Sequence, residues 1–318
     1  QFLIGVQSAK LAKELMAKSL SKTELDVTEM VTSAYYLTLV TQESLNILND
    51  NITNLEKMVE QTQNMVDAGM AEQIDADQLK ITSVQLKNSQ KSMERNLALN
   101  LNMLRFQLGL ESGTKIELTT SMGELVSNDA IVVSTLSNFV LSNNMDYQLY
   151  EGQEDISEKM LKLEKSAYLP TVSAFYTYNA KIVTTDFDMN APHVVGFNVS
   201  LPLFTSWNRQ SKVQKAKLEL DKVRNTKSML ADQLTLQSDQ LKYNLKTAME
   251  NYTLQKENVE LSQRVYSTYS RKYKEGIISS MDLTQANSAY LEAQSNYIQS
   301  VMSLLQAKLA LDKLNNTL

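Results

Sequence analysis

Long stretches without glycine or proline constrain this chain more than any other feature of its sequence. Both residue types interrupt regular structure, and the stretches that lack them are rich in Leu, Lys, Gln, Ala, Glu and Met, which favour helices. Four stretches contain none of the 8 glycines or 3 prolines: 6–68, 70–108, 203–275 and 277–318. Each is therefore predicted to be a long helix. Two of these helices would be about 90–100 Å long, far longer than a compact domain of this size is wide, so a rod is expected.

The chain also repeats itself at an offset of 207 residues. The hexapeptide that starts at Val6 recurs at Val213, and the same offset pairs Tyr36 with Tyr243 without a gap. A register held over such a length indicates an internal repeat. Each copy is predicted to be a long helix, a turn with glycine and a second helix running back, with apolar spacing typical of coiled coil. The predicted hairpins are residues 1–110, with its tip near 66–78, and 205–318, with its tip near 273–283.

A different kind of segment separates the two predicted helical hairpins. Residues 111–143 mix a β-prone piece, Lys115–Leu118, with a short helix around Ser134–Leu141. A helix over 144–168 should then stop before Pro170, because the residue before proline avoids helical geometry. Residues 169–204 are predicted to form two strands with a long outer loop. Their bounds are Thr171–Tyr178, the loop 179–193, and Val194–Phe204.

The second predicted strand alternates strictly between apolar and small polar residues. Val195, Phe197, Val199 and Leu201 alternate with Gly196, Asn198 and Ser200, which gives one apolar and one small polar face. The core of a sandwich and the wall of a membrane barrel both use this pattern. In a membrane one hairpin leaves its edges unpaired, so several copies would be needed. The residues predicted to form a membrane girdle near the strand ends are Tyr176, Tyr178, Phe204 and Trp207.

Composition argues against several classes of function. With 36 acidic and 31 basic side chains the net charge is −5, so there is no basic excess for nucleic acid. The chain has no cysteine, one histidine and no phosphate-binding glycine motif, and we therefore expect no enzyme, cofactor or metal. Asp186 and Asp188 fit a solvated loop better than a cation site. His193 is predicted to be plain loop, and no run of about 20 apolar residues predicts a membrane helix.

Three stretches carry a resemblance to a known family. They are Asn144–Tyr147 leading to Ala167–Ser173, then Gly196–Phe204, and then Tyr273–Leu283. In order and spacing they resemble the TolC-like outer-membrane efflux protein family, the outer membrane factors of tripartite efflux and type I secretion systems. The resemblance covers nearly the whole chain.

The resemblance implies a fold and a set of partners. It implies a mainly α fold with a small β part, in which two coiled-coil hairpins and a transmembrane β-hairpin build a trimeric α-barrel and β-barrel. Such a homotrimer is a passive exit duct for drugs or other substrates, in the outer membrane of a Gram-negative bacterium with its helices in the periplasm. Implied partners are a periplasmic adaptor (membrane fusion) protein, an inner-membrane pump of RND, ABC or MFS type, and outer-membrane lipid. The alternative is a non-channel coiled-coil structural or interaction protein of the cell envelope.

One departure from the family concerns the start of the chain. The repeat places the partner of residues 166–204 before Gln1, so the first β-hairpin of the family is missing from this sequence. We expect the chain to be a truncated or incomplete form of the mature protein. The family's signal sequence and any lipidated cysteine would lie in the missing part.

The tip turns contain the candidate functional residues. Gly69 and Gly276 are each followed six residues later by an acid, Asp75 and Asp282. One interpretation is structural: glycine closes one helix and aspartate caps the next. The resemblance implies another, in which Asp282 contributes to an acidic ring at the entrance. It also implies that Asp75 and Tyr273 help to hold the entrance closed, and that the turns with Ser279 and Ser280 dock the adaptor.

The match to the family's entrance is incomplete. A second acidic ring is absent, because position 285 is Gln. Ile278 stands where the family prototype has its gating arginine, and Ile74 stands where it has a threonine partner of that arginine. The contacts that close the entrance are therefore expected to be weaker or different in this chain.

Overall fold

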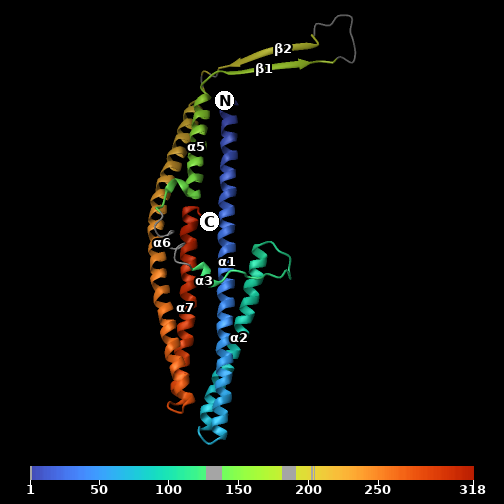
Figure 1. The fold of residues 1–318 in the computed structure, drawn as a ribbon. Coiled ribbons are helices and arrows are strands. Elements are labelled where there is room, and N and C mark those ends of the chain that lie inside the picture. Colours follow the sequence, from blue (N-terminus) through green and yellow to red (C-terminus); the bar gives the residue numbers. More distant parts are fainter. Residues whose placement is uncertain (1, 127–137, 181–190, 202, 204) are drawn as a thin grey trace. The chain divides into compact units, whose positions relative to one another are not determined.

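The computed structural model describes residues 2–126, 138–180, 191–201, 203 and 205–318. It is mostly helical with one small antiparallel sheet, as predicted, and the four stretches without breakers hold all or nearly all of its four longest helices (Figure 1). The elements in chain order are α1 (Phe2–Asp67), α2 (Gln73–Gln107), α3 (Met122–Leu125), η1 (Leu141–Asn143), α5 (Met145–Ser166), β1 (Thr171–Tyr178), β2 (His193–Ser200), α6 (Asn208–Lys274) and α7 (Ser280–Asn315). None of the described helices has a stretch that is long and apolar enough to cross a membrane.

The chain divides into two compact units, and each is described by itself. The first unit comprises Gln1–Lys22 and Met145–Gln233, and the second comprises Thr23–Asn144 and Leu234–Leu318. Both α1 and α6 therefore contribute one end to each unit. The first unit holds the strand hairpin, and the second holds both helical turns.

The core of the second unit lies mainly along α7. Leu304 and Leu311 of α7 are fully buried and pack with Leu245 of α6, and Tyr252 and Tyr297 lie against each other across the same pair of helices. Apolar residues at steps of three and four place this stripe on one face of α7. These apolar contacts therefore join α7 to α6 in the second unit.

Polar side chains add cross-links around α1 in this unit. Asn100 of α2 donates to the Thr41 hydroxyl at 2.9 Å, and Asn51 of α1 donates to Gln294 of α7 at 2.9 Å. Both Thr41 and Asn51 are buried, so an unpaired polar group at either position would be costly. These bonds favour one register of α1 against its neighbours.

In the first unit, α5 is held to α6 by charged groups. Glu154 accepts from Arg224 at 2.8 Å and from Lys227 at 2.9 Å, and Arg224 also donates to Glu158 at 2.6 Å. The hydrogen bonds from Lys227 and then Arg224 hold the pKa of the Glu154 carboxyl below its ordinary value. The ionised form of Glu154 is therefore the form that stabilises the packing of α5.

We expect this packing to weaken in acid. Because the pKa of Glu154 is lowered in the folded state, its contribution is complete above the pKa of an unfolded glutamate, about 4.3, and is lost as the pH falls through the lower folded value. Glu154→Gln should therefore lower the melting temperature at pH 7 and have little effect near pH 3. Thermal unfolding at both pH values tests this, with the exposed Glu219→Gln as control. An equal loss at both values would contradict it.

The strand hairpin is shorter than predicted on its second strand. β1 has the predicted bounds. β2 was predicted over Val194–Phe204, but it begins at His193 and ends at Ser200. Thr171 pairs with Ser200, and the residue before Thr171 is Pro170, which has no N–H to continue the ladder. The same register corrects the interpretation of His193, which is the first residue of β2 and not part of a loop.

Residues 111–143 also differ from expectation. Lys115–Leu118 form no strand, and α3 and η1 are the only regular elements that the structure describes in this segment. A strand needs a partner edge for its backbone groups, whereas here the carbonyl of Thr114 accepts from the Arg105 side chain at 2.6 Å. Half of the helix predicted around Ser134–Leu141 lies outside the described residues, and of its described half only Leu141 is helical, as the first residue of η1.

Candidate functional site

Both helical turns end their first helix in the same way. In the first turn the N–H of Gly69 bonds to Val66 O at 2.9 Å, and that of Met70 bonds to Met65 O at 2.8 Å. In the second, Gly276 and Ile277 make the equivalent bonds to the last turn of α6. This pattern is a Schellman motif, which requires a left-handed residue, and both glycines have φ of 71°. The sequence position of each glycine is therefore explained by backbone geometry.

The acids after the turns occupy the third helical position, not the cap itself. Ser279 is the N-cap of α7: its hydroxyl accepts from the Asp282 N–H at 3.2 Å, and Asp282 accepts from the Ser279 N–H at 3.2 Å. In the first turn Asp75 accepts from the N–H of Glu72, the N-cap of α2, at 3.2 Å. Both acids thus belong to capping boxes. The structural interpretation applies to both, with the capping residue three positions earlier than predicted.

Asp75 differs from Asp282 in having a partner on the other hairpin. The Ser280 hydroxyl, at the start of α7, donates to the second carboxylate oxygen of Asp75 on α2. Asp282 is exposed and interacts with Ser279 of its own turn. The structure therefore brings Asp75 and Ser280 together and leaves Asp282 available to solvent.

Tyr273 makes a second link between the hairpins. Its ring is buried, and its hydroxyl lies 2.9 Å from Oγ1 of Thr62, a fully buried residue of α1. Burial raises the pKa of the Tyr273 hydroxyl, and the charge of nearby Asp75 adds to this effect. Thr62 was not predicted from the sequence. The available signal was a β-branched hydroxyl residue on the apolar face of a long helix.

Apolar contacts surround these two links. Leu55 and Met58 of α1, Leu79 of α2 and Leu283 of α7 form a buried cluster with Tyr273. Ile278, which matches the prototype's arginine, is half-buried and packs against this cluster, whereas Ile74 is exposed. The tips are thus joined by two hydrogen bonds and an apolar cluster, with no arginine at the matching position.

The strand hairpin presents one apolar face to solvent. Because directly opposed residues of an antiparallel pair share a face, Val172 lies with Val199, Ala174 with Phe197, and Tyr176 with Val195. All of these side chains are exposed in the chain. An uncovered apolar strand face of this kind needs lipid or protein against it.

Aromatic residues gather at the loop end of that face. Tyr178 is paired directly with His193 and their rings are stacked at 4.8 Å, while the Tyr176 hydroxyl lies 2.7 Å from Nδ1 of His193. Trp207 is 73% exposed and has φ of 65°, just before α6 begins. Phe204 lies outside the described residues. The membrane-girdle role of all four predicted aromatics stays a prediction.

On the opposite face Phe175 covers Gly196. A Cβ at Gly196 would lie 2.4 Å from Cζ of the Phe175 ring, closer than real contacts allow. A side chain at this position would therefore have to displace the ring across the strand pair.

We expect Gly196→Ala to destabilise the hairpin by about 1 kcal/mol, because the Phe175 ring must leave its position. Adding Phe175→Leu should restore most of the loss. The measurement is thermal unfolding of the detergent-solubilised protein, with Asn198→Ala on the same face as control. The idea is wrong if Gly196→Ala and Asn198→Ala have the same effect.

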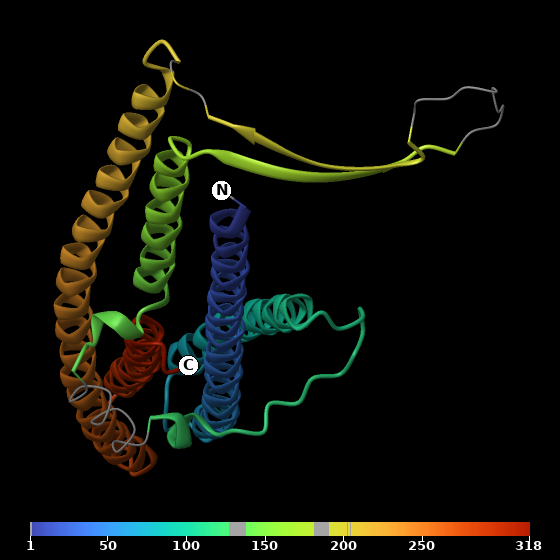
Figure 2. The ribbon, with the colours of Figure 1, turned by 90° about the horizontal axis from the view of Figure 1, so that it is seen from above.

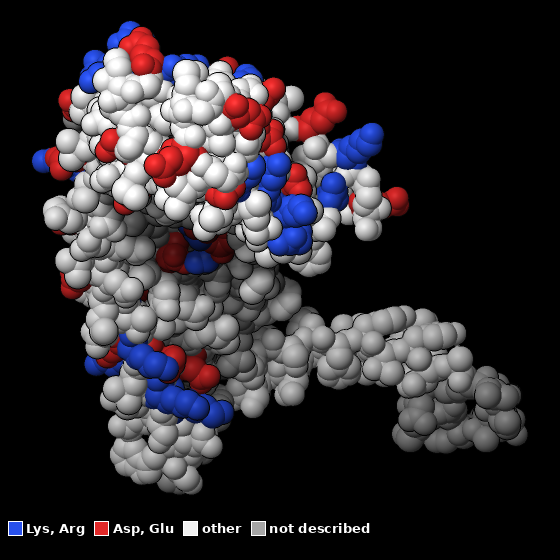
Figure 3. Space-filling model, turned by 90° about the horizontal axis from the view of Figure 1, so that it is seen from below, with Lys and Arg blue, Asp and Glu red and all other residues white. Residues whose placement is uncertain are grey.

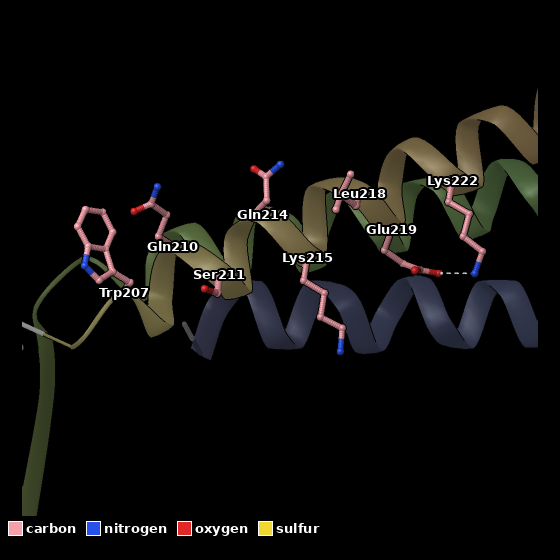
Figure 4. A pocket seen from close by; sticks show the side chains of 8 residues that line it. All are labelled: Trp207, Gln210, Ser211, Gln214, Lys215, Leu218, Glu219 and Lys222. Atoms are coloured by element: carbon pink, nitrogen blue, oxygen red, sulfur yellow. Dashed lines mark hydrogen bonds and ion pairs between the residues drawn. The ribbon is translucent and has the colours of Figure 1, made fainter.

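An open groove runs along the first turns of α6 (Figure 4). It has a volume of about 700 Å³ and extends from Trp207 to Lys222, which is paired with Glu219. Apart from Trp207, which precedes the helix, the labelled side chains project from α6, and they do not converge on a common point (Figure 4). In the described ranges, no group of three His, Asp or Glu residues could hold a metal ion. The groove thus shows no arrangement typical of a catalytic or cofactor site.

The fold is that of outer-membrane channels. The channel OprN superposes with a TM-score of 0.78 at 16% identity, covering 98% of this chain and 70% of that one. VceC of Vibrio cholerae superposes with a TM-score of 0.75 at 15% identity, covering 98% and 74%. The chain belongs to the outer membrane efflux protein family, whose sequence model matches residues 136–317.

A curated relative shares this assignment. The probable efflux pump outer membrane protein TtgC of Pseudomonas putida is 22% identical over 299 residues, which is 92% of this chain and 60% of TtgC. The chain thus spans less than two thirds of the length of that relative. The resemblance identified from the sequence is confirmed at the level of the family.

Proposed function

We propose that this chain forms the outer-membrane exit duct of an efflux system. The duct is a passive homotrimer, with the strand hairpins in the membrane and the long helices in the periplasm. The observation that carries the proposal is the exposed apolar face of β1 and β2 in a member of this family. A face of this kind is stable against lipid, and a hairpin with two open edges needs further strands to close.

Exposed apolar rows on the long helices support the trimer. On α6, Leu236 and Tyr243 are seven residues apart, as are Leu254 and Leu261, and all four are exposed. On α2, Ile74 and Ile81 have the same spacing and are also exposed. Heptad spacing on an exposed face is typical of a helix that packs against another helix. Neighbouring copies of the chain would cover these rows.

The tip geometry supports the internal repeat. Asp67 ends α1 and Lys274 ends α6, and these positions differ by the offset found in the sequence, as do Gln73 and Ser280, where α2 and α7 begin. Two similar hairpins per chain would give a trimer six hairpins around one axis. The pump would supply the energy, since the sequence has no phosphate-binding glycine motif. A periplasmic adaptor would hold the pump and the duct together.

The mass of the detergent-purified particle tests the proposal. The protein should be expressed from the native start of its gene and measured by light scattering, followed by conductance in a lipid bilayer. A trimer that needs detergent and conducts ions would support the duct. A soluble monomer or dimer would favour the coiled-coil scaffold instead.

We expect Asp282→Ala to reduce the cation selectivity of the reconstituted trimer several-fold. Three exposed carboxylates near a narrow pore attract cations, and Asp282 is exposed at the tip. Asp282→Asn retains an acceptor for the Ser279 N–H and should reduce selectivity equally. Reversal potentials in a salt gradient give the measurement. Unchanged selectivity in both variants would refute the assignment of Asp282.

A further inference from the structure

Basic side chains are concentrated in the part of the first unit next to the strand hairpin. Residues 2–13, 159–170 and 205–218 all belong to this unit, and they contain nine of the 31 basic side chains of the sequence but only one of its 36 acidic ones, Glu164. The rest of the chain is strongly acidic, since the whole has a net charge of −5. We call these nine basic residues the collar: Lys10, Lys13, Lys159, Lys162, Lys165, Arg209, Lys212, Lys215 and Lys217.

Contacts within the unit bring the three segments of the collar together. Lys159 of α5 donates to the Gln7 side chain of α1 at 3.1 Å. Glu164 of α5 lines one groove together with Lys212 and Lys215 of α6. The collar is therefore one surface built from three helices, although its segments are far apart in the sequence.

The collar also flanks both chain connections to the strand hairpin. Tyr168 precedes β1, Arg209 lies in the first turn of α6, and the Arg209 guanidinium lies over the Tyr168 ring at 5.6 Å from its centroid. The strands Thr171–Tyr178 and His193–Ser200 contain no charged residue. Positive charge thus begins where the uncharged strands end.

Along α6, ion pairs begin only beyond the collar. Lys222 pairs with Glu219 at 3.3 Å, and Lys227 pairs with Glu154 of α5 at 2.9 Å. Nearer to the hairpin, Lys215 forms no ion pair with a described residue (Figure 4). Four further collar side chains are exposed and likewise form no ion pair within the described ranges: Lys162, Lys165, Lys212 and Lys217. An exposed group of such cations attracts anionic partners.

The tip end of the second unit has a different charge pattern. Seen from that end, acidic and basic side chains are intermingled (Figure 3). Some of them are paired, as Lys87 is with Glu56 at 2.6 Å. A surface of mixed sign attracts anions weakly, whereas one sign predominates in the collar.

Exposed aromatic residues accompany the collar. Trp207 is 73% exposed and Tyr168 is 50% exposed, each in a connection between the hairpin and a helix. Tryptophan and tyrosine are enriched at the level of lipid headgroups, and the long stem of lysine lets its ammonium group reach phosphates beside the protein. Basic and aromatic side chains next to a membrane-embedded hairpin are complementary to anionic headgroups.

From these observations we infer that the collar binds anionic phospholipid headgroups in the periplasmic leaflet of the outer membrane. The inference rests on the proposed duct, in which the hairpin lies in the membrane, and it adds the chemistry of the lipid and the residues that select it. The ammonium and guanidinium groups pair with the phosphodiesters of the headgroups. A zwitterionic headgroup carries its own cation beside the phosphate, so it competes less well for the collar.

The single tryptophan of the sequence, Trp207, gives a local measurement. The protein is expressed from the native start of its gene, and any tryptophan outside these 318 residues is replaced by phenylalanine. It is reconstituted in phosphatidylcholine bilayers with a minor fraction of brominated phosphatidylglycerol or brominated phosphatidylcholine, because bromine quenches tryptophan only at short range. Phosphatidylglycerol should be enriched at least threefold around Trp207. Raising the salt from about 0.05 to 0.5 M should at least halve this preference.

Matched variants locate the site. Lys212→Gln with Lys215→Gln removes two exposed collar charges close to Trp207 in the sequence and should at least halve the preference for phosphatidylglycerol. Lys246→Gln with Lys256→Gln removes two exposed charges from the part of α6 in the second unit and should leave the preference unchanged. An equal effect of the two double variants would overturn the inference.

A soluble anion is the other source of phosphate that the collar could meet. Glycerol 3-phosphate, added at constant ionic strength, should leave the preference for phosphatidylglycerol unchanged. If it displaces the lipid, the collar is a site for soluble anions and the inference is wrong. Equal quenching by the two brominated lipids also rejects the inference and leaves the duct in place. Absence of quenching by either lipid would mean that Trp207 is not at a bilayer, which rejects the proposed function as well.

Discussion

The paired substitution Tyr273→Phe and Ser280→Ala is expected to convert the duct from mostly closed to mostly open. Each change removes one hydroxyl group and keeps the shape of the rest of the side chain. The first removes the bond to Thr62, and the second removes the bond to Asp75, which can still accept from Glu72. An opening movement that separates the two hairpins of one chain has to break both bonds.

The size of the effect follows from the number of links. Each hydrogen bond contributes about 1 kcal/mol, and two per chain in a trimer give about 6 kcal/mol, close to the ~5.5 kcal/mol that reverses a 1:99 population. Single variants should therefore show intermediate behaviour. Phenylalanine keeps the ring that Tyr273 contributes to the apolar cluster around Leu283, so folding should be retained.

Single-channel recording in a planar bilayer gives the measurement. The control is Tyr269→Phe with Ser303→Ala. It also removes one tyrosine hydroxyl from α6 and one serine hydroxyl from α7, but it leaves both links in place. The control should keep the low conductance of the wild type. If the double variant and the control conduct equally, the two links do not hold the entrance closed.

The second large effect is expected at the exposed rows of α6. Leu236→Lys together with Leu254→Lys should convert the trimer to monomers in detergent. Each leucine that a neighbouring copy covers contributes about 1.5–3 kcal/mol, and a buried unpaired lysine adds a further cost. Both residues are exposed in the chain, at 71% and 65%, so folding of the monomer should be affected little.

Light scattering of the detergent particle and circular dichroism check this prediction together. Gln237→Lys with Thr253→Lys adds the same charge one residue away from each tested leucine and should leave the trimer intact. Monomers with wild-type helix content are expected for the leucine variant alone. A trimer in both variants would place the interface elsewhere on the chain.

Several parts of the candidate site could be predicted because they depend on local sequence. Gly69 and Gly276 were placed in the turns because a left-handed residue after a helix is a local requirement, and the structure has both at positive φ. The acids at a fixed distance from these glycines were placed beside the turns for the same reason. Their exact position in the capping boxes depended on which residue became the N-cap.

Contacts between distant residues could not be predicted in this way. Thr62 and Tyr273 are separated by most of the chain, and only the packing of α1 against α6 brings their hydroxyl groups together. The link from Ser280 to Asp75 likewise depends on how the starts of α7 and α2 are packed. Neither pair has a spacing that a helix or strand period would connect.

The long helices, their turns and the alternating strands follow from the order of residues alone. Breaker-free stretches, glycine positions and hydrophobic period act over a few residues, and α1, α2, α6 and α7 formed where these signals predicted them. The tertiary structure decided the register instead. It ended β2 at Ser200 and placed His193 in that strand. These features depend on which side chains meet across elements, because burial and pairing energies act between residues that the sequence separates.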